Sequence, residues 1–94
     1  MSRRRVVVTG LGTVNPLAET VEGFWQAALA GTSGVARITL FDPSEFTTQI
    51  GAEVKNWDPE RYMPRKEARR LDRNGEFFLA ASGMALDDAG ISYE

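Results

Sequence analysis

Basic side chains that could bind an anionic partner are concentrated in residues 61–73. Only Glu67 and Asp72 offset them, so this stretch carries a net charge of +4 while the remainder of the chain carries −6. Mutual repulsion opposes such a concentration, and a helix disfavours each cation in its first turn by roughly a few tenths of a kcal/mol. The cluster therefore predicts an anionic partner. It contains six of the eleven lysine and arginine residues of the 94-residue chain: Arg61, Arg65, Lys66, Arg69, Arg70 and Arg73.

The residues around the basic cluster distinguish between nucleic acid and an acidic protein as the anionic partner. If the stretch is one helix, Arg65, Arg69 and Arg73 share a face through their i, i+4 spacing. No aromatic residue lies between Arg65 and Arg73 to stack on bases, and the whole chain has a net charge of −2. Nucleic acid is therefore a poor candidate, and an acidic protein surface fits better. The alternative is a solvated helix face whose partners are acids elsewhere in the chain.

A second candidate for anion binding is the sequence Thr9-Gly10-Leu11-Gly12, which follows three valines at 6–8. The β-branched run predicts a strand buried on both faces. A strand, a glycine turn and a helix also open many nucleotide-binding units, but the third glycine of that fingerprint falls on Asn15, and Pro16 follows it. No acidic residue lies where a ribose contact would need one. The spacing argues against a dinucleotide site and predicts a tight turn that uses glycine dihedral angles.

The chain contains no cysteine and no histidine. It therefore has no thiolate nucleophile, no imidazole base and no ordinary zinc site, and we expect neither a metal nor a cofactor. The adjacent Asp87 and Asp88 diverge by about 100° on a helix, so they do not form a catalytic dyad. The lack of cysteine, and of any apolar run long enough to span a membrane, agrees with a cytoplasmic protein.

The pattern predicts an amphipathic helix over residues 21–30. Thr20 is a suitable N-cap, Glu22 complements the helix dipole, and Gly31 is a natural C′ residue. We expect Trp25 to lie in the core. The apolar face consists of Val21, Phe24, Trp25, Ala28 and Leu29.

The middle of the chain gives weaker signals. Residues Val35–Phe41 are expected to form an extended connection in which Phe41 packs, and Asp42-Pro43 is expected to begin a turn. Ile50–Val54 has the composition of a short strand, which the sequence Trp57-Asp58-Pro59 ends.

A helical pattern resumes at Pro64 and stops at Gly90. Asn74-Gly75 predicts a break between a short leading helix and a longer one. Most residues of the apolar face after Leu71 are small, so the helix is expected to lie close against another element. The face is formed, at alternating spacings of three and four, by Ala68, Leu71, Gly75, Phe78, Ser82, Ala85 and Ala89.

These elements are unbalanced for a complete domain. One convincing strand at 6–8 would leave its backbone donors and acceptors unpaired, because the chain supplies no strand to flank it. The 94 residues are therefore expected to be an incomplete domain, the front of a larger unit.

Together the segments resemble the N-terminus of the β-ketoacyl-acyl-carrier-protein synthases, particularly the type II elongating enzymes. The order and spacing of the matching pieces hold over essentially the whole chain. The pieces are RRVVVTGLG at 4–12 with Pro16, Glu22 and Trp25, LAGTSGV at 29–35, ITLFDPS at 38–44, AEV at 52–54, RKEARRLDR at 65–73 and ALDDAG at 85–90.

The resemblance implies an α/β fold, in which residues 1–94 form the N-terminal portion of a thiolase-like αβαβα five-layered sandwich that assembles as a homodimer. It also implies acyltransferase chemistry of fatty-acid biosynthesis: decarboxylative Claisen condensation of an acyl-enzyme with malonyl-acyl-carrier protein. The family's catalytic cysteine and two histidines lie beyond position 94, so the chain alone is expected to be inactive. The family's docking surface for acyl carrier protein includes basic residues that match Lys66, Arg69 and Arg70.

Two alternatives stay open. After Leu71-Asp72-Arg73 the family usually has phenylalanine and, two positions later, glutamine, whereas this chain has Asn74 and Glu76. This departure leaves a polyketide ketosynthase as an alternative to a fatty-acid enzyme. From another class of function, the chain could be a non-catalytic module that binds an acidic partner protein through its basic helix.

Overall fold

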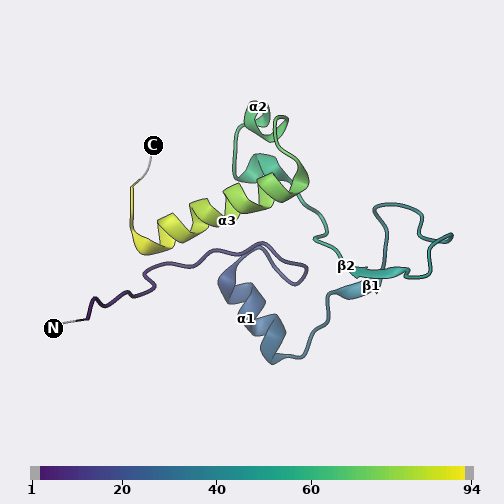
Figure 1. The fold of residues 1–94 in the computed structure, drawn as a ribbon, viewed down its shortest axis with the longest axis horizontal. Helices are drawn as coiled ribbons and strands as arrows, with labels where there is room; N and C mark the ends of the chain where they lie inside the picture. The colour runs from purple at the N-terminus through teal and green to yellow at the C-terminus, as the bar shows by residue number, and fades with distance from the viewer. Residues whose placement is uncertain (1–2, 93–94) are drawn as a thin grey trace.

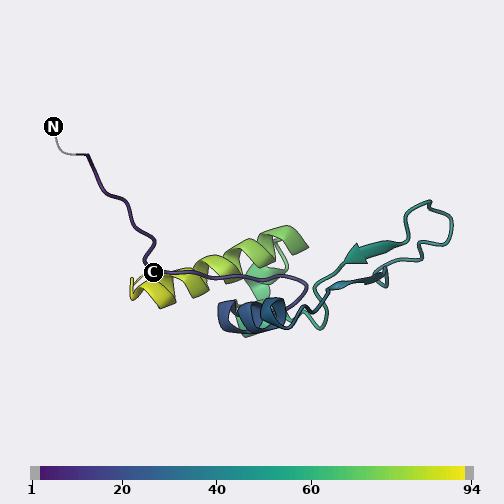
Figure 2. The same ribbon diagram turned by 90° about the horizontal axis from the view of Figure 1, so that it is seen from below.

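The computed structural model describes residues 3–92, in which two longer helices flank the N-terminal segment and a small hairpin projects away from them (Figure 1). The view from below shows the same separation of the hairpin from the helices (Figure 2). In chain order the elements are α1 (Val21–Leu29), β1 (Val35–Arg37), β2 (Ile50–Ala52), the 3-10 turn η1 (Pro59–Arg61), α2 (Arg65–Ala68) and α3 (Arg73–Ala89).

Helix α1 begins and ends as the sequence predicts. The Thr20 hydroxyl accepts the Gly23 N–H at 3.0 Å, and Gly31 follows the helix with a φ of 73°. The expected core position of Trp25 is wrong, because its side chain is 56% exposed. No described element covers this face of the helix. The apolar face that the sequence predicts is therefore present but exposed to solvent among residues 3–92.

The two short strands form an antiparallel hairpin. Val35 lies opposite Ala52, and Arg37 lies opposite Ile50. The predicted strand at Ile50–Val54 is therefore present but shorter. The expected extended connection Val35–Phe41 contains β1, whose pairing the sequence did not reveal.

The loop between the strands is organised by one carboxylate rather than by an apolar cluster. Glu53 accepts hydrogen bonds from the Thr39 N–H and hydroxyl and from the Leu40 N–H, at 2.9–3.2 Å. These bonds favour the ionised form and lower the pKa of Glu53. Phe41 meets Phe46 edge to face at 5.7 Å but is 55% exposed, so its expected packing is confined to that one contact.

The predicted strand at residues 6–8 does not form in the structure. Val6 is 94% exposed, and the beginning of the described chain extends away from α3 without a strand beside it among the described residues (Figures 1 and 2). A strand is stabilised by hydrogen bonds to a neighbouring strand. The prediction of a buried strand is therefore wrong for residues 3–92, because these residues supply no strand with which the valines can pair.

Gly10 and Gly12 let this N-terminal segment approach the backbone of α3. A Cβ on Gly10 would lie 2.2 Å from the Ala85 carbonyl oxygen, and one on Gly12 would lie 2.1 Å from that of Ala81. Neither glycine has a positive φ, so the predicted tight turn is wrong. The prediction that α3 lies close against another element is confirmed. The Leu11 N–H also donates to the Asp88 carboxylate at 2.9 Å.

The break between the two C-terminal helices lies at residues 69–72, before the expected position at Asn74-Gly75. Helix α2 ends at Ala68, and Asp72 caps α3 by accepting the Gly75 N–H at 2.7 Å. Asn74 and Gly75 therefore lie in the first turn of α3 rather than at the break, because a capping aspartate begins a helix more effectively than a glycine ends one here. As predicted, Gly90 ends α3, with a φ of 72°.

The buried core is small and lies where η1, α2 and α3 meet. Among residues 3–92, the buried side chains of this core are Met63, Ala68 and Ala80, and Trp57 and Tyr62 are among those packed around them. The sequence predicts Phe78 on the packing face of α3, but this prediction is wrong, because the Phe78 side chain is 75% exposed. The face of α3 that contains Ala80 packs against the core instead. The radius of gyration is 16.8 Å, against about 12 Å for a compact chain of this length.

We expect the isolated 94-residue polypeptide not to fold as a cooperative monomer. Large apolar side chains on α1, the hairpin and residues 6–8 are exposed, and so little burial cannot offset the conformational entropy lost on folding. Urea unfolding monitored by circular dichroism, together with amide NMR spectra, checks this. A sharp two-state transition with dispersed amide signals from a monomer would contradict it.

Substituting Gly12→Ala should destabilise the complete protein by about 1–3 kcal/mol, because the added carbon must push two backbones apart. Gly51→Ala is the matched control, since its Cβ would meet only the Ile38 side chain, at 3.4 Å. Thermal unfolding of both variants gives the comparison. Equal melting temperatures for the two would show that the close approach does not constrain the fold.

Candidate functional site

The basic stretch does not form one continuous helical face. Arg65 lies in α2 and Arg73 lies in α3, so the shared face expected from i, i+4 spacing is absent. The six cations instead separate into two that are held by contacts within the chain and four that project into solvent.

Arg61 is held by the carboxylate of Glu19. One guanidinium nitrogen lies 2.8 and 2.9 Å from the two carboxylate oxygens, and the guanidinium carbon lies 5.7 Å from the centre of the Tyr62 ring. The Tyr62 hydroxyl donates to the same carboxylate at 3.2 Å. Partial burial and the nearby Glu19 charge raise the pKa of Tyr62, because both disfavour the phenolate. This network connects residue 19 to the segment that leads into α2.

Arg73 is held at the beginning of α3. Its guanidinium donates a hydrogen bond to the Val54 carbonyl and lies 5.1 Å from the centre of the Phe77 ring. This cation therefore fastens the segment after β2 to α3 and is not free to meet a partner.

The other four cations form an exposed surface that we call the basic turn, which consists of Arg65, Lys66, Arg69 and Arg70. They come from the four residues of α2 and the two that follow it, and all four side chains are exposed. Within residues 3–92, none of them makes a side-chain hydrogen bond or ion pair. All three residues predicted to dock a partner, Lys66, Arg69 and Arg70, lie in this turn.

An aromatic cluster beside α2 was not anticipated from the sequence. Trp57 stacks on Tyr62 at 5.5 Å with the ring planes 13° apart, and it meets Phe77 edge to face at 4.8 Å. The Trp57 Nε1–H donates to the Glu76 carboxylate at 3.0 Å. No periodicity relates residues 19 positions apart, so the one sequence signal was Glu76, at a position where the family usually has glutamine.

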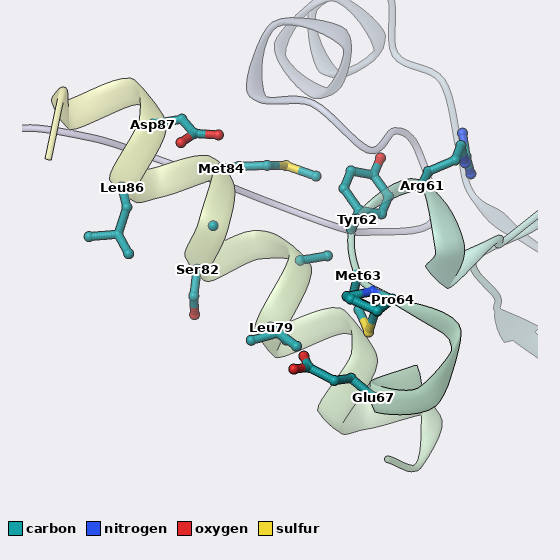
Figure 3. Close-up of a pocket in the computed structure, with 12 residues that line it drawn as sticks. Arg61, Tyr62, Met63, Pro64, Glu67, Leu79, Ser82, Met84, Leu86 and Asp87 are labelled. Carbon is teal, nitrogen blue, oxygen red and sulfur yellow. The ribbon is translucent and has the colours of Figure 1, made fainter. Parts of the chain in front are cut away.

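An open groove of about 460 Å³ lies between residues 61–67 and α3. Figure 3 shows Met63 and Met84 on opposite sides of it, with Glu67 and Asp87 among its polar residues. Its lining is mainly apolar, contains no cysteine or histidine, and does not include Lys66, Arg69 or Arg70. The groove and the basic turn are therefore separate surfaces.

Metal binding and membrane crossing find no support in the described part of the chain. Residues 3–92 bring no three acidic, histidine or cysteine side chains together in a metal-binding group. None of the described helices has the length and apolar character to cross a bilayer.

Comparison with known families identifies the class of protein to which this fold belongs. Residues 3–94 match the model of the β-ketoacyl synthase N-terminal domain, so the chain belongs to the β-ketoacyl synthase family. The resemblance inferred from the sequence is thereby confirmed.

Particular relatives agree with this assignment. The chain is 46% identical to 3-oxoacyl-[acyl-carrier-protein] synthase 2 of Vibrio cholerae and 47% identical to the enzyme of that name from Coxiella burnetii, each over 97% of this chain and 22% of the relative. The solved structure called the ishigamide ketosynthase/chain length factor superimposes with a TM-score of 0.83 at 36% identity, over 97% of this chain and 23% of that one. The chain thus spans about a fifth of these relatives, and its α/β character matches a ketosynthase.

Proposed function

We propose that this chain is the N-terminal part of a ketosynthase that extends acyl chains in fatty-acid biosynthesis. In this reaction a cysteine takes an acyl group from acyl carrier protein, malonyl-carrier protein loses carbon dioxide, and the resulting carbanion attacks the acyl thioester. The product is longer by two carbons. The observation that carries the proposal is the 46–47% identity to synthases of that name over nearly the whole chain.

The reacting groups come from other parts of the protein, because these 94 residues contain neither cysteine nor histidine. The contribution of this chain is to the scaffold and to recognition. We place it in a thiolase-like five-layered sandwich within a cytoplasmic homodimer. The strand-forming valines at 6–8 and the uncovered apolar face of α1 support a larger assembly, since both need neighbours.

The basic turn docks the acidic carrier protein through Lys66, Arg69 and Arg70. Its cations are exposed and unengaged within residues 3–92, whereas Arg61 and Arg73 are already held by partners. Charges at such an exposed rim act mainly on the encounter rate and on the register of the complex.

The two alternatives receive less support. Membership of a condensing-enzyme family disfavours a non-catalytic binding module. The names of the curated relatives favour fatty-acid elongation over polyketide synthesis. The departure at Glu76 has a structural explanation, because its carboxylate accepts the Trp57 N–H; nothing in the structure explains Asn74.

The 94-residue polypeptide should not become acylated when incubated with acyl-carrier protein, because it lacks a nucleophile for the thioester. Intact-mass spectrometry provides the measurement, and the complete synthase is the positive control. A specific acyl adduct on the 94 residues that hydroxylamine releases, as it releases an ester, would contradict the expectation.

Reversing two charges of the basic turn, Lys66→Glu with Arg70→Glu, should raise the apparent KM of the complete enzyme for carrier-borne substrate by roughly tenfold, about 1.4 kcal/mol. Turnover of a small acyl thioester that bypasses the carrier should change little. Salt should mimic the substitutions, since the screening length falls to about 3 Å at 1 M.

The matched control is Lys55→Glu, which reverses an exposed lysine outside the basic turn. It should leave the KM for carrier-borne substrate near its original value. Equal losses with both substrates in the double variant would assign the basic turn a structural role instead.

A further inference from the structure

Helix α2, which carries half of the basic turn, is too short to be stable by itself. It has four residues, and its N-cap, Pro64, provides no side-chain hydrogen bond. Isolated helices of this length are not populated in water, so the position of α2 depends on tertiary contacts. The one buried residue of α2, Ala68, belongs to the small core cluster with Met63 and Ala80.

The segment that leads into α2 is held to α3 by Trp57. Its indole ring lies against Tyr62 on one side and Phe77 on another, and its N–H donates to Glu76. Phe77 and Glu76 both belong to the N-terminal part of α3. Trp57 therefore fastens residues 57–62 to the helix that begins directly after the basic turn.

Glu76 also lies close to the cations themselves. An open groove of about 270 Å³ is lined by Arg65, Arg69 and Glu76, together with Pro59, Glu60 and Ala68. The carboxylate that accepts the indole N–H thus borders the same surface depression as two residues of the basic turn. The hydrogen bond between Trp57 and Glu76 therefore joins the segment before α2 to the beginning of α3, next to both ends of the basic turn.

We infer that Trp57 and Glu76 are positioning residues of the carrier-docking surface: their hydrogen bond fixes the orientation in which the basic turn meets an acidic carrier protein. This inference rests on the proposed docking function of the basic turn. Neither residue belongs to the basic turn itself, since Trp57 precedes α2 and Glu76 lies in α3. Their effect is to keep the cations in one arrangement, which lowers the conformational cost of binding.

The test uses the complete synthase with Glu76→Leu, which keeps a side chain of similar size but removes the acceptor. The apparent KM for carrier-borne substrate should rise about three- to tenfold, the effect of one lost hydrogen bond. The rate with a small acyl thioester should stay near its original value. Trp57→Phe, which keeps an aromatic ring and loses the N–H, should give the same pattern.

The conservative variant Glu76→Gln should rescue binding, because its amide oxygen still accepts the indole N–H. The KM of the Glu76→Gln enzyme should lie within about twofold of that of the unchanged enzyme. If its KM rises as much as that of Glu76→Leu, the carboxylate charge matters rather than the hydrogen bond, and the positioning role is wrong. Glu22→Leu is the matched control, since Glu22 also lies in a first helical turn and, among residues 3–92, its side chain accepts one hydrogen bond, from Gln26. It should leave both substrates unaffected.

A combined variant distinguishes this inference from the function on which it rests. Adding Glu76→Leu to the Lys66→Glu, Arg70→Glu enzyme should raise KM little further, because the positioned cations are already lost. If the charge reversals alone have no effect, the docking function fails. If they act but Glu76→Leu does not, or if Glu76→Leu slows both substrates equally, the positioning role is wrong.

Discussion

The close approach of the N-terminal segment to α3 is the constraint on which the rest of the arrangement depends. At Gly10 and Gly12 the two backbones come so near that no Cβ fits between them. The hydrogen bond from Leu11 to Asp88 fixes the register of this contact. Helix α3 also packs against η1 and α2. The two glycines, by letting the N-terminal segment contact α3, therefore help to set the position of the basic turn relative to the beginning of the chain.

Local signals in the sequence were sufficient for the ends of the long helices and for the family. Thr20, Gly31 and Gly90 act where the pattern places them, because capping depends on a few neighbouring backbone groups. The same local reasoning failed at Asn74-Gly75, where a glycine suggested a break. The competing signal, Asp72 as an N-cap, was equally local and proved stronger.

Contacts between distant segments could not be predicted in this way. The pairing of β1 with β2 and the contact of Trp57 with Glu76 depend on how the chain folds back, which no periodicity encodes. The six clustered cations show the difference most clearly. Sequence alone treats them as equivalent, yet Glu19 holds Arg61 and the Val54 carbonyl holds Arg73, leaving four exposed.

The break between α2 and α3 gives the basic turn a second source of positive potential. The backbone N–H groups at the start of α3, a helix of 17 residues, follow immediately after Arg70, Leu71 and Asp72. A helix N-terminus is equivalent to roughly half a positive charge, of which the Asp72 carboxylate offsets a part. A continuous helix through this region would have placed its positive end at Pro64 instead. Part of the positive electrostatic potential at the basic turn therefore comes from the backbone of α3. Substituting the basic side chains does not remove this part.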